Sequence, residues 1–370
     1  MTGGGSPLSE ALADVVVLTL PGRAADFAGY LLAHLGARVV KVDLPGTPER
    51  SVSFALAYDR GTERVLIDPA EPVDAARLEE LVRSSDVVIT DATVAEPALS
   101  RDRIRTLHPA ALHAEISTFG ASGPGAGVRG GDLLATAASG FLHLTGAPGE
   151  PPVRMGADQA AKLAGAEANA AIMIALMHRD RTGIGQHLDV SMRDAMIRAT
   201  VNAIPKYRYE GAVQQRVGDH WGVREKPLKS LWRCRDGWVS FVRRGGALGG
   251  RVNHACVAWM AEHGMDVEDL ASVDWDAMDL GSDADRARID RLDELFEVFL
   301  AGQAAEDVFQ EGLRRGMTIA PVRTLDDVLR EPQFVERSYW AEQEVDGRSV
   351  RVPSFVVKDR GVRAAEEVPA

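Results

Sequence analysis

The N-terminal third of the chain alternates between short apolar runs of strand length and stretches with apolar residues at helical spacing. Residues 15–20 form an apolar run, residues 24–35 carry helix-spaced apolar side chains, and residues 38–42 read as a second strand. A strand, helix, strand unit of this kind requires parallel strands joined by a right-handed crossover. The pattern therefore predicts an open, doubly wound α/β domain whose ligand lies at the carboxyl ends of the strands.

The same alternation continues to about residue 191, and the character of the chain changes from about residue 225. Residues 232–242 have the aromatic and β-branched composition of a strand pair around a turn at Asp236-Gly237. The other predicted strands cover residues 64–67, 86–89, 112–116 and 186–191, and the other predicted helices cover residues 74–82, 101–107 and 285–301, with two more starting at Asp132 and at about Ala157.

Composition excludes several classes of function. The net charge of -12 opposes nucleic-acid binding, which needs a basic face. The two cysteines, Cys234 and Cys256, form no CxxC pair, and no HxxxH or HExxH pattern occurs, so neither a disulfide framework nor a metal site is expected. The early turn lacks GxGxxG, so no NAD is expected.

The N-terminus has no basic region before an apolar run, and the most apolar helical stretch, residues 168–177, is half the length needed to span a bilayer. We therefore expect a cytoplasmic protein without a membrane segment.

Four segments together point to a known family. They are HLGARVVKVDLPG (34–46), SGPGAGVRGGDLLATAASG (122–140), PPVRMGADQAAKLAGAEANAAIMIALMHRDRTGIGQHLDVSMRDA (151–195) and GMTIAPVRTLDDVLREPQF (316–334). Jointly they resemble the class III CoA-transferases, the CaiB/BaiF family. Residues 232–238 and 257–265 resemble the branch that includes benzylsuccinate CoA-transferases more than they resemble formyl-CoA transferases.

The resemblance implies a fold and an assembly. It implies a large Rossmann-like domain built from both chain ends, a smaller inserted domain, and two protomers threaded through each other as linked rings. We expect a tail at residues 1–13, a large domain at 14–224 and 326–370, and a small domain at 225–325. The ligand would be coenzyme A or an acyl-CoA, together with a carboxylic acid.

In this family an Asp in the third segment accepts the acyl group from the thioester, and here that position is Ala161. Counting nine residues forward from Pro152, or seventeen back from His178, leads to the same alanine. Asp158 lies about 4.5 Å further toward the helix start, so it is either a displaced nucleophile or a first-turn carboxylate favoured by the helix dipole. Asp132 matches a frequent family Asp and is either functional or a helix N-cap.

CoA needs cations and backbone donors for its phosphates. Leu44 and Glu63 stand where the family often has cations, and Thr90-Asp91-Ala92 replaces its ENF element. The positions that the resemblance assigns to CoA are Lys41, Asp43, Arg60, Arg64 and Arg129. For any single arginine among them, solvated surface charge is the alternative interpretation.

Glycines recur in GGALGG, at Gly245, Gly246, Gly249 and Gly250. The segment resembles the mobile loop that covers the acyl intermediate in formyl-CoA transferases, and a plain surface loop explains the same residues.

Racemisation is disfavoured. The racemase branch needs a His before Asp132 and an Asp at the nucleophile position, but Gly131 and Ala161 occupy these two positions.

Three other functions remain open. The favoured hypothesis is a catalytically silent subunit, in a homodimer or in a heteromer with an active paralogue. The alternatives are a CoA-transferase that uses Asp158, and a repurposed fold with a non-CoA ligand or different chemistry.

Overall fold

The computed structural model describes residues 10–92, 96–200, 202–222 and 227–354, which divide into two compact units. The first unit is built from the described parts of Met1–His143, Val153–Glu210 and Gln333–Ala370, and the second from Leu144–Pro152 and Gly211–Pro332. The main junctions of these units lie at 210/211 and 332/333, whereas the family resemblance predicts domain boundaries at 224/225 and 325/326.

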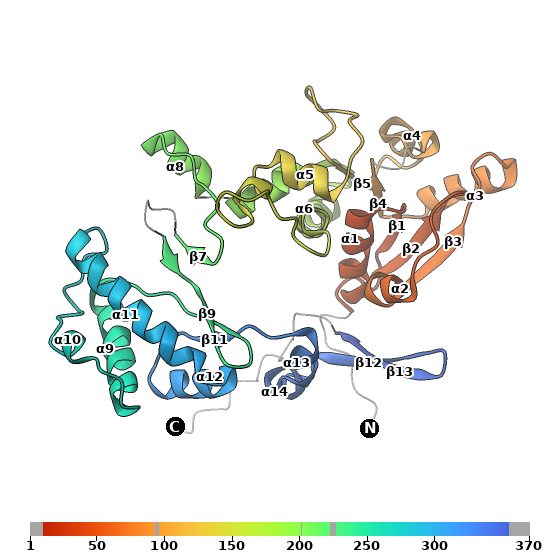
Figure 1. The fold of residues 1–370 in the computed structure, drawn as a ribbon. Helices are drawn as coiled ribbons and strands as arrows, with labels where there is room; N and C mark the ends of the chain where they lie inside the picture. Colours follow the sequence, from red (N-terminus) through yellow and green to blue (C-terminus); the bar gives the residue numbers. More distant parts are fainter. Residues whose placement is uncertain (1–9, 93–95, 201, 223–226, 355–370) are drawn as a thin grey trace, which may run out of the picture. The chain divides into compact units, whose positions relative to one another are not determined.

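The first unit contains a six-stranded parallel sheet with the order β3-β2-β1-β4-β5-β6 (Figure 1). The predicted α/β class and Rossmann-like sheet are therefore confirmed. The strands are β1 (Val16–Thr19), β2 (Arg38–Asp43), β3 (Thr62–Leu66), β4 (Val87–Asp91), β5 (Leu112–Ser117) and β6 (His187–Ser191).

Helices connect these strands or follow the last of them, and a β-hairpin lies near the C-terminus. The helices are α1 (Arg23–His34), α2 (Val52–Tyr58), α3 (Pro72–Arg83), α4 (Arg101–Leu107), α5 (Asp132–Ala138), α6 (Gln159–Thr182), α7 (Met192–Ile197), α8 (Ala203–Glu210) and α14 (Pro332–Glu336). The hairpin is formed by β12 (Trp340–Val345) and β13 (Arg348–Pro353).

Alternate residues of the sheet feed two separate cores. Val17 of β1 belongs to the core on the side of α1 and α6, while its neighbour Leu18 belongs to the core that contains Leu78 of α3 and Ile104 of α4. Burial on both faces explains why the central strands β1 and β4 read as continuous apolar runs in the sequence.

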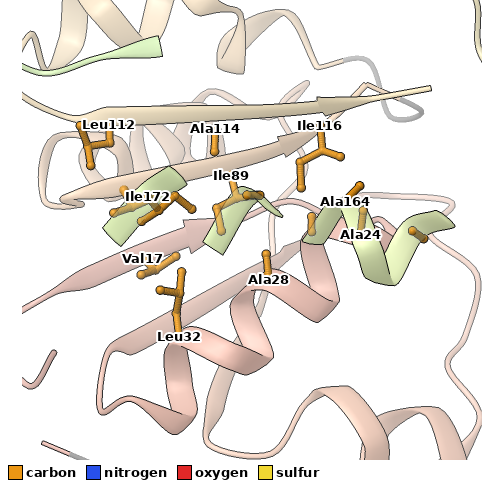
Figure 2. Close-up of a cluster of buried hydrophobic side chains, with 14 of the residues drawn as sticks. Val17, Ala24, Ala28, Leu32, Ile89, Leu112, Ala114, Ile116, Ala164 and Ile172 are labelled. Carbon is orange, nitrogen blue, oxygen red and sulfur yellow. The ribbon is translucent and has the colours of Figure 1, made fainter. Parts of the chain in front are cut away.

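Helices α1 and α6 pack closely because small residues line their contact. Figure 2 shows Ala24 and Ala28 of α1 beside Ala164 of α6. A Cβ atom on Gly165 would lie 2.7 Å from the carbonyl oxygen of Ala24 and 3.2 Å from the amide nitrogen of Ala28. Only glycine therefore allows this separation of the two helices.

Helix α6 is longer than the apolar run 168–177 suggested. Its 24 residues are long and apolar enough to cross a membrane, but half of its most apolar window is buried inside the unit. A core helix of a soluble protein has the same features, so this one helix is weak evidence for a membrane span.

The second unit pairs a small sheet with helices around an aromatic core. The predicted strand pair is confirmed, because Trp238 and Arg233 are antiparallel partners around the Asp236-Gly237 turn. The core contains Trp232, Trp275 and Phe296. The elements are β7 (His220–Trp221), β8 (Leu228–Lys229), β9 (Leu231–Arg233), β10 (Trp238–Ser240), β11 (Ala320–Pro321), α9 (Gly246–Glu262), α10 (Glu268–Ala271), α11 (Asp283–Ala301), α12 (Ala305–Arg314) and α13 (Leu325–Arg330).

The prediction of a loop at Gly245–Gly250 is wrong, because α9 begins at Gly246 and includes Gly249 and Gly250. A Cβ atom on Gly249 would lie 1.7 Å from the carbonyl oxygen of Arg244, and one on Gly250 would lie 2.0 Å from Oδ1 of Asp276. Glycines 249 and 250 are thus explained by close packing, and Gly245 is the N-cap of the helix.

Replacing Gly165 with alanine should destabilise the first unit by about 1–3 kcal/mol, despite the better helix propensity of alanine. The reason is overpacking against the backbone of α1. Urea unfolding measures the change. Gly302→Ala is the control, since Gly302 has φ -86° and its nearest contact for a Cβ atom is 3.6 Å away. Equal stability of Gly165→Ala and wild type would contradict the packing account.

Candidate functional site

A pocket of about 680 Å³ opens at the carboxyl end of β1, where the strand order of the sheet reverses between β1 and β4. This is the usual ligand position in doubly wound sheets. A Cβ atom on Gly22, the N-cap of α1, would lie 2.1 Å from Oδ2 of Asp91, so this close approach of the start of α1 to the end of β4 requires glycine. The lining residues are Pro21, Gly22, Arg23, Asp26, Thr47, Pro48, Glu49, Arg50, Ser51, Ser53, Phe54, Ala57 and Tyr58.

Behind this pocket lies a buried ion network centred on Lys41. Its side chain is 1% exposed, and Nζ donates to Asp26 Oδ1 at 3.2 Å, to Asp59 Oδ1 at 2.9 Å and to the carbonyl oxygen of Tyr58 at 2.7 Å. Arg50 Nη1 donates to the same two carboxylates, at 3.0 Å and 2.8 Å. Lys41 is therefore fully engaged within the protein.

Arg64 and Asp43, two other predicted CoA positions, pair with each other at the edge of this network. Asp43 also lies 3.7 Å from Arg50. Glu63 accepts two hydrogen bonds of 2.9 Å from Arg38, which hold the pKa of its carboxyl below the ordinary value. The structure thus brings Lys41, Asp43 and Arg64 together, but as partners of neighbouring charges.

The remaining two predicted cations lie apart from this network. Arg60 donates to the hydroxyl of Tyr30 at 2.9 Å and to the backbone carbonyl of Pro353. Arg129 is exposed and lies outside the lining of both pockets described here. Sequence reasoning missed Arg23 and Arg50, which do line the first pocket.

The first pocket has little net charge. Two cations, Arg23 and Arg50, face two carboxylates, Asp26 and Glu49, and the formal charges of the four side chains sum to zero. Burial and, next in size, the carboxylate of Asp158 raise the pKa of Tyr58, which keeps its hydroxyl neutral. The pocket therefore attracts a polyphosphate only weakly.

A second pocket of about 540 Å³ brings the two candidate carboxylates together. It is lined by Arg23, Gly131, Asp132, Leu133, Leu134, Ala137, Arg154 and Asp158. Arg23 lines both pockets, and its guanidinium lies 3.6 Å from Asp158 and 4.3 Å from the ring centre of Phe54.

Asp132 caps a helix, but a different one from the helix expected. Gly131 is the N-cap of α5, whereas Asp132 Oδ1 accepts hydrogen bonds from the amides of Ala160 at 2.7 Å and Ala161 at 3.2 Å. These amides lie in the first turn of α6, so a carboxylate 28 residues earlier satisfies donors that the start of a helix leaves free.

Asp158 is the N-cap residue of α6 and has a left-handed backbone, with φ 47° and ψ 60°. Ala157 before it also has a positive φ of 66°. Two consecutive residues of this kind are costly, and such strain often lies at functional sites. The Asp158 side chain, 30% exposed, pairs with Arg154 at 3.0 Å as well as with Arg23.

Ala161 lies in the first turn of α6 with 1% of its surface exposed. It belongs to the apolar core between the sheet and the helices, outside the lining of the second pocket. Position 161 therefore offers an inert methyl group near the two carboxylates.

A further cluster was missed because it depends on strand pairing. His113 and Glu115 of β5 meet His187 of β6, three groups whose ligand atoms lie within 4.8 Å of one another. The metal-binding motifs HxxxH and HExxH describe residues on one helix, so they do not reveal a cluster shared by two strands. The cluster could be predicted only by pairing the predicted strands 112–116 and 186–191 in the correct register.

The comparisons with known proteins agree with the fold and the sequence motifs. The model of CoA-transferase family III matches residues 12–370, so the chain belongs to this family. The chain is 28% identical to the succinyl-CoA:(R)-benzylsuccinate CoA-transferase subunit BbsE of Thauera aromatica, over 88% of this chain and 82% of that protein. It is 27% identical to the succinyl-CoA--L-malate CoA-transferase alpha subunit of Chloroflexus aurantiacus, over 90% and 79%.

Two solved structures share the fold. A CAIB/BAIF family protein from Brucella suis has a TM-score of 0.76 and 24% identity, over 95% of this chain and 97% of that chain. Rv3272 from M. tuberculosis has a TM-score of 0.75 and 21% identity, over 96% and 94%.

Asp132→Ala should lower the free energy of unfolding by about 0.5–2 kcal/mol, the usual cost of removing a helix cap. Asp132→Asn should cost less because the amide keeps an oxygen acceptor. Chemical denaturation measures both variants. Asp180→Ala is the control, because Asp180 is an exposed residue near the opposite end of α6, the helix that Asp132 caps. A loss for Asp180→Ala as large as for Asp132→Ala would refute the capping role.

Proposed function

We propose that this chain is a CoA-transferase family III subunit that supplies no acyl-accepting carboxylate and works beside a family chain that supplies one. The observation that carries the proposal is Ala161, which stands at the position where the family resemblance places the nucleophile and is buried in the apolar core. An alanine methyl group can neither attack a thioester nor carry an acyl group.

The two nearby carboxylates are already engaged. Asp132 holds the first-turn amides of α6, and Asp158 is held between Arg154 and Arg23. An attacking carboxylate needs a free lone pair at the thioester carbon, and two guanidinium partners stabilise its charge in the ground state. Both groups therefore serve the structure of the site better than they serve nucleophilic attack.

Exposed apolar residues support an assembly of two chains. On α6, Ile174 and Met177 are 69% and 63% exposed, and on α8, Tyr209 is 93% exposed. Apolar surface of this kind is typical of a protein interface. Two relatives are named as subunits. We propose that a second chain of this family covers these helices, as a linked-ring homodimer or, for activity, as a heteromer.

The proposed ligand is an acyl-CoA, with its nucleotide in the 680 Å³ pocket and its acyl end toward the 540 Å³ pocket. Arg23 supports this path because it lines both pockets. The near-neutral first pocket and the engaged Lys41, Asp43, Arg60 and Arg64 support weak binding of the nucleotide. Arg129, exposed beside α5, is free to approach a phosphate from outside.

One observation favours a second candidate, an active transferase that uses Asp158. This carboxylate lines a pocket, is partly exposed and sits on a strained backbone one helical turn before Ala161. Rotation away from both Arg154 and Arg23 would free its oxygens for attack on a thioester.

The test is acyl-enzyme trapping on the isolated chain. After incubation with succinyl-CoA and then hydroxylamine, the wild-type chain should carry no hydroxamate at any residue by peptide mass spectrometry. Asp158→Asn should give the same result. The control is Asp180→Asn, which keeps all pocket residues. A hydroxamate at Asp158 that disappears in Asp158→Asn would establish the second candidate and refute the silent subunit.

Binding of free CoA tests the charge of the first pocket. Glu49→Gln should tighten CoA binding by about two- to fivefold at low salt, because it removes an exposed negative charge from the pocket wall. Arg23→Gln should weaken it by a similar factor. Isothermal titration measures both, and Glu80→Gln on α3 is the control for an exposed acid outside the pocket. Absence of saturable CoA binding would favour the repurposed fold with another ligand.

A further inference from the structure

His113, Glu115 and His187 form a compact cluster on neighbouring strands, away from both pockets. His113 and His187 are paired residues of β5 and β6, and their ring centres are 5.0 Å apart. Glu115 is two residues after His113, so it points to the same face of the sheet. His187 Nε2 and Glu115 Oε2 lie 3.0 Å apart.

The buried histidine has one ring nitrogen without a partner. His113 is 5% exposed, and its Nε2 lies 2.8 Å from Oγ1 of Thr90 on β4. Its Nδ1 is buried and has no hydrogen-bond partner among the residues that the structure describes. A buried nitrogen of this kind is costly unless something binds it. When Nε2 carries the proton and donates it to Thr90, Nδ1 presents a lone pair.

Two imidazoles and a carboxylate are the donor set that zinc and related divalent transition ions prefer. The ligand atoms of the three residues lie within 4.8 Å of one another. Around a tetrahedral zinc ion with bonds of about 2.0–2.1 Å, ligand atoms are about 3.3 Å apart, so small side-chain rotations would close the site. The hydrogen bond to Thr90 would orient His113, as partners of metal-bound histidines usually do.

The protonation states suit a cation. Burial and, next in size, the neighbouring His187 lower the pKa of His113 to about 4, so its ring is neutral at pH 7. The hydrogen bond with His187 lowers the pKa of Glu115, so its carboxylate is charged. These are the forms in which both residues ligate metals.

We propose that His113, Glu115 and His187 bind one divalent transition-metal ion of the zinc class, which ties the edge strand β6 to β5. The ion takes a lone pair from each imidazole and an oxygen from Glu115, and it replaces the hydrogen bond between His187 and Glu115. The site is independent of the acyl-transfer proposal, because none of its residues lines either pocket.

The test uses the full chain without a polyhistidine tag, stripped of metal with a chelator. Titration with Co²⁺, followed by its visible absorption, should show one equivalent bound in a tetrahedral environment, and Zn²⁺ should displace it. His187→Gln and Glu115→Gln should each abolish this stoichiometric binding. Thr90→Val should weaken it by about tenfold or more, because His113 loses its orienting partner.

His178→Gln is the matched control, since His178 is an exposed histidine on α6 outside the cluster. It should bind one equivalent of Co²⁺ like the wild type. Zn²⁺ should also raise the Tm of the wild type and of His178→Gln but leave the Tm of His187→Gln unchanged. Lack of saturable binding in the wild type, or equal binding by the wild type and His187→Gln, would overturn the proposal.

Discussion

The close contact between α1 and α6 is the constraint on which the site depends. Gly165 lets the backbone of α6 approach Ala24 and Ala28 of α1, and the starts of both helices then lie at the same end of the sheet. Arg23 is the first residue of α1 and Asp158 directly precedes α6, so this packing brings their side chains within 3.6 Å of each other. One arginine can therefore line both pockets and, together with Arg154, neutralise the partly exposed carboxylate of Asp158 at the start of α6.

The alanine at position 161 fits this packing without strain. A side chain in the first turn of α6 that is 1% exposed adds to the apolar core and needs no partner. Asp132 still caps the amides of Ala160 and Ala161, so the helix start keeps its hydrogen bonds although the position contributes no chemistry. We interpret the chain as one that preserves the architecture of its family and leaves the chemical step to a partner.

The sheet could be predicted from the sequence because its central strands β1, β2 and β4 are mainly apolar runs that alternate with helical stretches. The helix starts, the roles of charged residues and the function of glycines could not. Asp132 caps a helix 28 residues later, and Lys41 meets Asp26 and Asp59 only in the folded chain. Glycines are typical of both flexible loops and close packing, so the sequence alone suggests a loop at Gly249 and Gly250, although both residues allow α9 to pack. The histidine cluster depends on the register of β5 and β6.

The most direct test of the silent-subunit account is intact-mass spectrometry of a reconstituted complex. The complex would combine this chain with a family chain from the same genome that carries an aspartate at the corresponding position, and succinyl-CoA would be the donor. The account predicts that the acyl mass appears only on the partner chain, while this chain keeps its unmodified mass. A succinyl adduct on this chain, removed by hydroxylamine, would contradict it.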